Sequence, residues 1–134
     1  PASWEGIPSE TLTVIEQICH VRDIEIEGYQ VRFRRLLEES NPALVSIDTY
    51  ALVSQYRYAE ADPTEVLRKI RGARHQTVEL IGNLTESQLN RTGFFDGYGK
   101  VTVKGLIHYL CSHDQQHLAG MQWLLGQIES QSAS

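Results

Sequence analysis

Hydrophobic and polar positions follow a helical period over the first third of the chain. Between Ser9 and Glu39 the hydrophobic residues recur at steps of three, four or seven, which predicts one long amphipathic helix. Ser9 is a good N-cap for this helix, and Pro42 favours its end because the residue before a proline avoids helical geometry. Gly28 indicates a bend or a close helix crossing. The hydrophobic or small positions are Leu12, Ile15, Cys19, Ile26, Tyr29, Phe33, Leu36 and Leu37.

Helical signals continue through the rest of the chain. Ser46 or Asp48 lies near the start of a second, shorter helix, and Asp62 followed by Pro63 is a strong start signal for a third. Thr102 is the expected N-cap of the last helix. After the first helix, the predicted helical segments cover residues 47–58, 62–82, 85–88 and 102–129.

Extended structure is predicted at one place only. Residues 90–100 form a glycine-containing loop in which 94–95 and 100–101 are able to pair as a short hairpin. No stretch shows sustained period-two alternation, so the fold class is all-α, with short connections favouring antiparallel neighbours in a bundle. We expect one domain over residues 1–129 and a frayed C-terminal tail over 130–134.

Composition and charge exclude several classes of protein. The chain has 134 residues, and 12 Lys and Arg against 17 Asp and Glu give a net charge of −5. This acidic balance argues against nucleic-acid binding, which needs a basic surface. We predict no membrane span and no export signal, and therefore a cytoplasmic protein. Cys19 and Cys111 are expected to be free thiols and small core residues, because two cysteines are too few for a disulfide framework.

The sharpest chemical feature is a pair of histidines on the last helix. His113 and His117 lie one turn apart, so both project from the same helix face. That face also carries Leu106 and Leu110 and therefore points inward. Buried imidazole nitrogens need partners. A bound metal ion and hydrogen-bonded neutral imidazoles are the two alternatives that the spacing leaves open.

A third imidazole on another helix would favour the metal. His20, on the first helix, is the best candidate, whereas His108 lies about 140° away from His113 around the helix. His75 is expected at the surface. Three imidazoles with open coordination positions would describe a catalytic site rather than a closed structural one.

Other chemistries fit less well. A zinc-protease motif requires Glu directly after the first His, where this chain has Asp114. A di-iron bundle requires Glu three residues before the His, where Gln17 and Leu110 stand. No phosphate-binding loop or serine nucleophile motif is present. The arginines at 32, 34 and 35 are interpreted as a solvated helix face.

Four segments of the chain form a recognisable pattern. They are Trp4 with the helix carrying 18–25, then 56–58, 95–102 and 113–118. The most specific of them is the segment His113 to Leu118, and the order and spacing of all four matter more than any one. Together they resemble the DinB superfamily, also described as DinB/YfiT-like metalloenzymes, and the resemblance covers nearly the whole chain.

The resemblance implies an up-down-down-up four-helix bundle with one divalent metal ion. It implies His20, His113 and His117 as the ligands, and zinc, nickel, iron or manganese as the metal. Characterised relatives transfer low-molecular-weight thiols such as bacillithiol or mycothiol, which implies a thiol co-substrate and a small-molecule substrate. Family members usually have a further helix before Trp4, so we expect that first helix to be absent from this chain and a homodimer to cover the exposed hydrophobic face.

Two carboxylates are hypothesised to orient ligands or handle protons. They are Asp23, three residues after His20, and Asp114, which is directed about 100° away from His113 and so is able to reach a neighbouring helix instead. The leading hypothesis is a metal-dependent transferase or hydrolase-like enzyme. The alternatives are a ligand- or partner-binding bundle with a vestigial metal site, and a structural dimer with hydrogen-bonded histidines.

Overall fold

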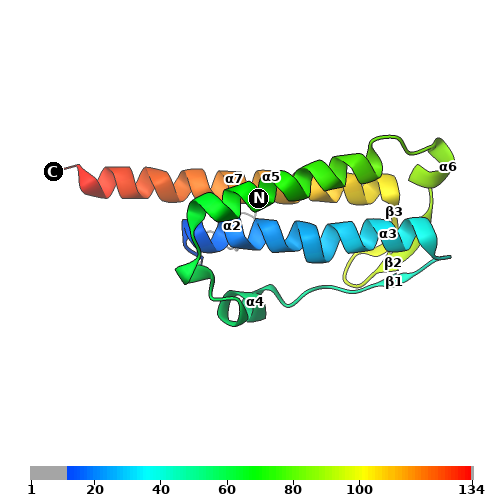
Figure 1. The fold of residues 1–134 in the computed structure, drawn as a ribbon, viewed down its shortest axis with the longest axis horizontal. Coiled ribbons are helices and arrows are strands. Elements are labelled where there is room, and N and C mark those ends of the chain that lie inside the picture. Colours follow the sequence, from blue (N-terminus) through cyan, green and yellow to red (C-terminus); the bar gives the residue numbers. More distant parts are fainter. Residues whose placement is uncertain (1–11, 134) are drawn as a thin grey trace.

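The computed structural model describes residues 12–133 and is all-α with one small sheet. Three helical stretches lie along the long axis of the molecule (Figure 1). They are a continuous first helix, α5 (Pro63–Ile81) and α7 (Val103–Ser132). The first helix and α5 run in the same direction, and α7 runs opposite to both (Figure 1). This is the order of the last three helices in the expected up-down-down-up bundle, and the long connection 39–62 returns the chain to the starting end before α5 begins.

The first helix is built from three pieces. They are α2 (Val14–Asp23), a π-helical segment η2 (Ile24–Tyr29) and α3 (Gln30–Glu38). Thr13 caps α2 in a capping box with Glu16, and residues 12 and 13 are not helical. The start predicted at Ser9 lies outside the described residues, but a helix running unbroken from there through Thr13 was a wrong expectation.

The π-helical segment changes which side chains face the core. It widens the helix at Gly28, and the helical phase predicted from a 3.6-residue period is therefore wrong around it. Ile26 was assigned to the hydrophobic face but is exposed, whereas Glu25 is buried. Arg32, assigned to a solvated face, is also buried.

The connection after α3 holds two short helices. Helix α4 (Thr49–Gln55) is capped by Asp48 and is shorter than predicted, and a 3₁₀ turn η3 (Tyr58–Glu60) follows it. Asp62 caps α5 as predicted. Helix α6 (Glu86–Leu89) begins with a capping box between Thr85 and Gln88.

A three-stranded sheet closes one end of the bundle. The predicted hairpin is present as β2 (Thr92–Phe95) and β3 (Gly99–Thr102), with Phe94 opposite Lys100. The third strand, β1 (Ala43–Leu44), pairs in parallel with β2 and was not predicted. Gly97 and Gly99 have positive φ angles of 85° and 81°, which lets the tight turn between the hairpin strands form.

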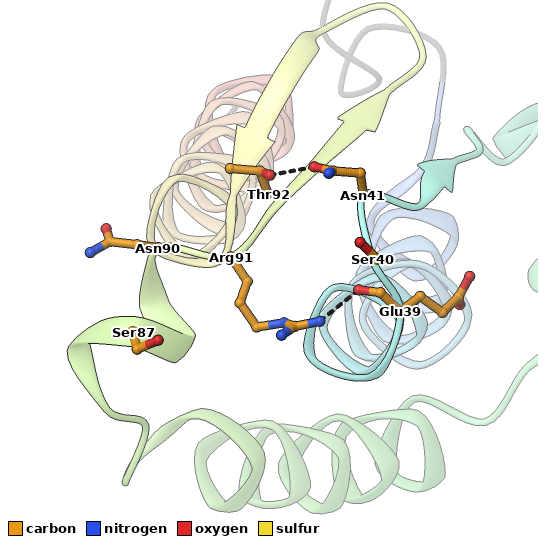
Figure 2. Close-up of a pocket in the computed structure, with 7 residues that line it drawn as sticks. All are labelled: Glu39, Ser40, Asn41, Ser87, Asn90, Arg91 and Thr92. Atoms are coloured by element: carbon orange, nitrogen blue, oxygen red, sulfur yellow. Dashed lines mark hydrogen bonds between the residues drawn. The ribbon is translucent and has the colours of Figure 1, made fainter.

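The same end of the bundle holds a polar pocket of about 290 Å³, and the polar groups around it serve to end α3 (Figure 2). Arg91 donates from Nε to the Leu36 carbonyl (2.6 Å) and from Nη2 to the Glu39 carbonyl (2.7 Å). Thr92 bonds Asn41 across the same gap (Figure 2). The last carbonyls of α3 are thus satisfied by an arginine, and the pocket holds none of the candidate catalytic groups.

The core joins the sheet to the long helices. A cluster around Phe33, Leu36, Phe95 and Leu106 packs the sheet against α3 and α7, and a second around Cys19 and Tyr58 holds η3 against α2. The first cluster also contains Ile24 of η2 and Leu110 of α7, so it joins the first helix to α7.

Helix α7 extends well past the rest of the bundle at its C-terminal end (Figure 1). It continues to Ser132, although residues from 130 onward were expected to fray. None of the helices within residues 12–133 is long and apolar enough to cross a membrane.

Candidate metal centre

Three histidines meet where α2 and α7 face each other. His20 and His117 are buried and His113 is partly buried, and one ligand atom from each lies within 4.8 Å of the others. The Nε2 atoms of His20 and His113 are 3.2 Å apart. The ring centroids are 4.6 to 5.2 Å apart. The structure therefore brings together the three residues that the sequence selected.

Local helix geometry explains this convergence. The one-turn spacing of His113 and His117 places both rings on the inward face of α7, which also carries Leu106 and Leu110. His20 follows Cys19, which packs beneath η3, so the inward face of α2 is fixed by hydrophobic contacts. Of the remaining histidines of the described chain, His75 is exposed, as predicted, and His108 is exposed as well.

A neutral amide orients one of the rings. The Nδ1–H of His117 donates to Oε1 of the fully buried Gln17, at 3.1 Å. This bond leaves Nε2 of His117 as its ligand atom. Gln17 lies one turn before His20 on α2 but was not predicted as a site residue. A glutamine three residues before the histidine was noted only as evidence against a di-iron site.

The environment keeps the three imidazoles neutral. Burial lowers the pKa of His20 to about 4, an effect that the nearby Asp23 carboxylate opposes. Burial and the neighbouring His117, His20 and Arg32 lower the pKa of His113 to about 3. Burial and His20 lower the pKa of His117 to about 4. Each ring therefore retains a nitrogen lone pair at neutral pH, which is the form that binds metals.

The residues present fit a divalent transition-metal ion. Two nitrogens bound to one tetrahedral ion at about 2.0–2.1 Å are separated by roughly 3.3 Å. The two Nε2 atoms of His20 and His113 are 3.2 Å apart. Neutral imidazoles suit zinc, nickel and iron. Three nitrogen ligands without a fourth would leave positions open for water or substrate.

Asp23 lies beside the centre but is bonded elsewhere. Its carboxylate accepts from the Tyr58 hydroxyl at 2.5 Å and from Arg22 at 2.8 and 2.9 Å. Burial and this bond to Asp23 raise the pKa of Tyr58 above its usual range. Asp23 therefore acts on His20 through its charge, and no hydrogen bond joins it to an imidazole in the described chain.

Asp114 reaches the neighbouring helix α5, as its angle on α7 allowed. It accepts from Nη2 of Arg74 at 2.5 Å. Arg74 also forms a forked ion pair with the buried Glu25, and Thr77 donates to the same carboxylate at 2.7 Å. The network ties α7, α5 and η2 together behind the histidines. A role for Asp23 or Asp114 in ligand orientation or proton transfer stays a prediction.

Two cavities formed by the described residues adjoin the centre. The smaller, about 170 Å³, is lined by His20 and His113 together with Tyr29, Arg32 and Phe95. The larger, about 490 Å³, is an open hydrophobic groove between α2, α5 and α7 that His117 reaches. Cys111 enters neither and is exposed, so its assignment to the core was wrong. Both cysteines are free thiols.

An all-α bundle with three inward histidines from two of its helices is a framework that could hold one metal ion. The chain belongs to the DinB superfamily, whose family model matches residues 7–121. Among solved structures, YfiT from Bacillus subtilis has a TM-score of 0.80 and 24% sequence identity, covering 87% of this chain and 67% of its own. YfiT is described as a probable metal-dependent hydrolase with an unusual four-helix bundle topology. No curated protein sequence matches the chain.

Proposed function

We propose that this protein is a divalent-metal-dependent enzyme acting on a small molecule. The observation that carries the proposal is the convergence of three neutral imidazoles, whose ligand atoms lie within 4.8 Å of one another. His20, His113 and His117 would hold one ion of zinc, nickel, iron or manganese. The description of YfiT as a probable metal-dependent hydrolase supports the same chemistry here.

The metal would supply Lewis acidity, which lowers the pKa of a bound water or thiol until it is a nucleophile at neutral pH. The protein's own residues set the conditions for this. Three neutral ligands add no negative charge, so the full charge of the ion acts on the nucleophile. No carboxylate lines the smaller cavity within residues 12–133, so this cavity offers no competing general base.

Tyr29 supplies a proton donor at the same cavity. Burial raises its pKa to about 12, so the phenol stays protonated at neutral pH. Its ring centroid lies 6.1 Å from that of His113. A protonated phenol in this position is suited to donate a hydrogen bond to an oxygen on which negative charge develops during the reaction.

Hydrolysis and thiol transfer share this centre and differ only in the nucleophile. We propose a bacillithiol- or mycothiol-type co-substrate as the thiol, on the strength of the family's chemistry, and a reducing cytoplasm as the location, on the strength of the two free cysteines. The alternative is a bundle that retains the metal but has no turnover.

The test is an activity comparison between metal-free and metal-reconstituted protein. A chromogenic ester and a chromogenic electrophile are each supplied with and without the thiol. Metal-dependent product that requires the thiol would identify a transferase, and metal-dependent product without it would identify a hydrolase. Fully loaded protein with no turnover across both screens would contradict the enzyme proposal and favour the vestigial site.

A further inference from the structure

We propose that the smaller cavity beside the three histidines recognises a carboxylate group of the substrate, and that Arg32 is the residue that binds it. This inference rests on the proposed function, because only an enzyme would have a substrate here. Its physical basis is a buried, incompletely bonded cation facing the same cavity as His20 and His113.

Arg32 is buried without a counter-charge. It is 7% exposed, and no carboxylate within residues 12–133 forms an ion pair with it. Its one hydrogen bond in the described chain runs from Nη2 to the carbonyl of Val45, at 3.3 Å, and its Nε has no partner. A buried cation left in this state is costly, whereas a ligand anion in the cavity would supply the missing counter-charge.

The surroundings hold the guanidinium in place. Its central carbon lies 4.4 Å from the centroid of Phe95 and 5.3 Å from that of Tyr29. Gly28, one turn earlier, leaves the space that the group occupies, since a Cβ there would lie 3.1 Å from Nη1. Aromatic contacts on a planar cation fix its orientation and therefore the direction of its donors.

The cavity selects the chemical class of the anion. Its volume of about 170 Å³ suits a small molecule, and its walls include Ile24, Ile47 and the aromatic rings of Tyr29, Phe95 and Tyr98. One planar guanidinium matches the two oxygens of a carboxylate. Hydrophobic walls suit a compact hydrophobic or aromatic body. Hydroxyl groups of Ser46 and Thr49 also line the cavity, so its small volume and hydrophobic walls are what favour a monocarboxylic acid over a phosphate.

Arg32 would act by positioning. With the carboxylate at Arg32, the remainder of a small acid would lie in the same cavity as His20 and His113, beside which the metal nucleophile would be generated. An arginine that served only to join α3 to the segment at Val45 would need its Nη2 bond but no ligand.

The test is a nuclear magnetic resonance titration of the metal-free protein with benzoate, and with benzamide as its neutral counterpart. We expect benzoate to bind at least about tenfold more tightly, with a shift of the Arg32 Nε–H signal, because the contact is charge-assisted. Equal affinities, or no shift at Arg32, would overturn the proposal. Tighter binding of inorganic phosphate than of benzoate would overturn the assignment to a carboxylate.

Variants separate the charge from the fold. Arg32→Met should weaken benzoate binding about tenfold, whereas Arg34→Met, an exposed arginine of the same helix, should not change it. Arg32→Lys keeps the charge and should keep the preference over benzamide. If Arg32→Met fails to fold, the wild-type comparison and the lysine variant decide. Unchanged benzoate affinity in a folded Arg32→Met protein would contradict the proposal.

The benzoate titration uses metal-free protein, so its result does not depend on whether the three histidines bind a metal ion. Benzoate binding in a protein that takes up no metal would leave the carboxylate site standing while the proposed enzyme function fails. Metal uptake without benzoate binding would reject the carboxylate site and leave the metal centre intact.

Discussion

At the residue scale, a neutral amide holds the imidazole of His117 where many metal sites use a carboxylate. A carboxylate partner makes a histidine ligand more basic and adds negative charge near the ion. Gln17 holds the ring through Nδ1 at 3.1 Å without doing either. An ion bound here would therefore stay strongly electrophilic, which suits the proposed activation of water or a thiol.

Replacing Gln17 should weaken the metal site without destroying it. We expect Gln17→Leu to lower metal affinity roughly 10- to 100-fold, because the ring of His117 loses its orienting partner. The measurement is competition against a chelating dye. Gln76→Leu, at an exposed position of α5, is the matched control. Equal affinities in the wild type and Gln17→Leu would show that the amide does not orient the ligand.

The three histidines should make the metal-free protein sensitive to acid. Their pKa values in the folded state are about 4, 3 and 4, below the value of about 6.5 expected in the unfolded chain. The unfolded chain therefore binds more protons as the pH falls from 6.5 towards 4, and the free energy of unfolding decreases over this window.

Chemical denaturation of the metal-free protein at pH 7 and pH 5 measures this loss. A His113→Gln variant should lose less stability between the two conditions than the wild type. His75→Gln, at an exposed position, should behave as the wild type does. An identical loss in all three proteins would mean that the cluster is not the source of the acid sensitivity.

At the element scale, the π-helical segment η2 determines what lies behind the site. It turns Glu25 inward, where Arg74 and Thr77 satisfy it, and Arg74 in turn bonds Asp114. Burial raises the pKa of Asp114, and Arg74 opposes the shift. Asp114 follows His113 directly, so the network fixes the turn of α7 that carries two of the ligands.

Removing the arginine should destabilise the protein. Arg74→Met leaves the Glu25 carboxylate buried with only Thr77 as a side-chain partner, and breaking a fully buried pair costs about 3–5 kcal/mol. Since the Arg74 side chain is 41% exposed, we expect a smaller loss, about 2 kcal/mol. Urea unfolding measures it, with Arg71→Met as the exposed control. A loss no larger than that of the control would contradict a structural role for the network.

The sequence predicts most of these elements for physical reasons that are local. The caps at Asp62, Thr85 and Thr102 act within one turn of their own helices, and the histidine pair shares a face because of helix geometry alone. The prediction that His20 joins this pair came from the resemblance and from the inward position of His20 on its helix. The structure brings the three side chains together.

What the sequence could not predict depends on distant contacts. The π-helical segment has no local signal, so the burial of Glu25 and Arg32 was missed. Strand β1 is two residues long and forms only because β2 lies beside it. Gln17 became recognisable as a site residue only once His117 was placed next to it.

At the scale of the whole molecule, the free end of α7 supports the proposed homodimer. This part of the helix extends beyond the bundle (Figure 1) and exposes several large hydrophobic side chains. They are Trp123, Leu125 and Ile128, each between 46% and 53% exposed. Large exposed hydrophobic side chains on a helix that leaves its bundle are suited to a protein interface.

Trp123→Glu should therefore convert a dimer into a monomer. The charge would have to be buried at the interface, and light scattering after size-exclusion chromatography measures the mass. Gln127→Glu adds the same charge at an exposed polar position of α7 and should disturb association less. A monomeric wild-type protein would contradict the homodimer.

The central claim is that His20, His113 and His117 hold one divalent metal ion, and elemental analysis of untagged protein by inductively coupled plasma mass spectrometry tests it most directly. The account predicts about one equivalent of zinc, nickel, iron or manganese per chain, its loss in His113→Ala, and its retention in His108→Ala, whose histidine is exposed on the same helix. A wild-type protein that contains no metal and takes up none when divalent ions are added, or a His113→Ala variant with unchanged metal content, would contradict it.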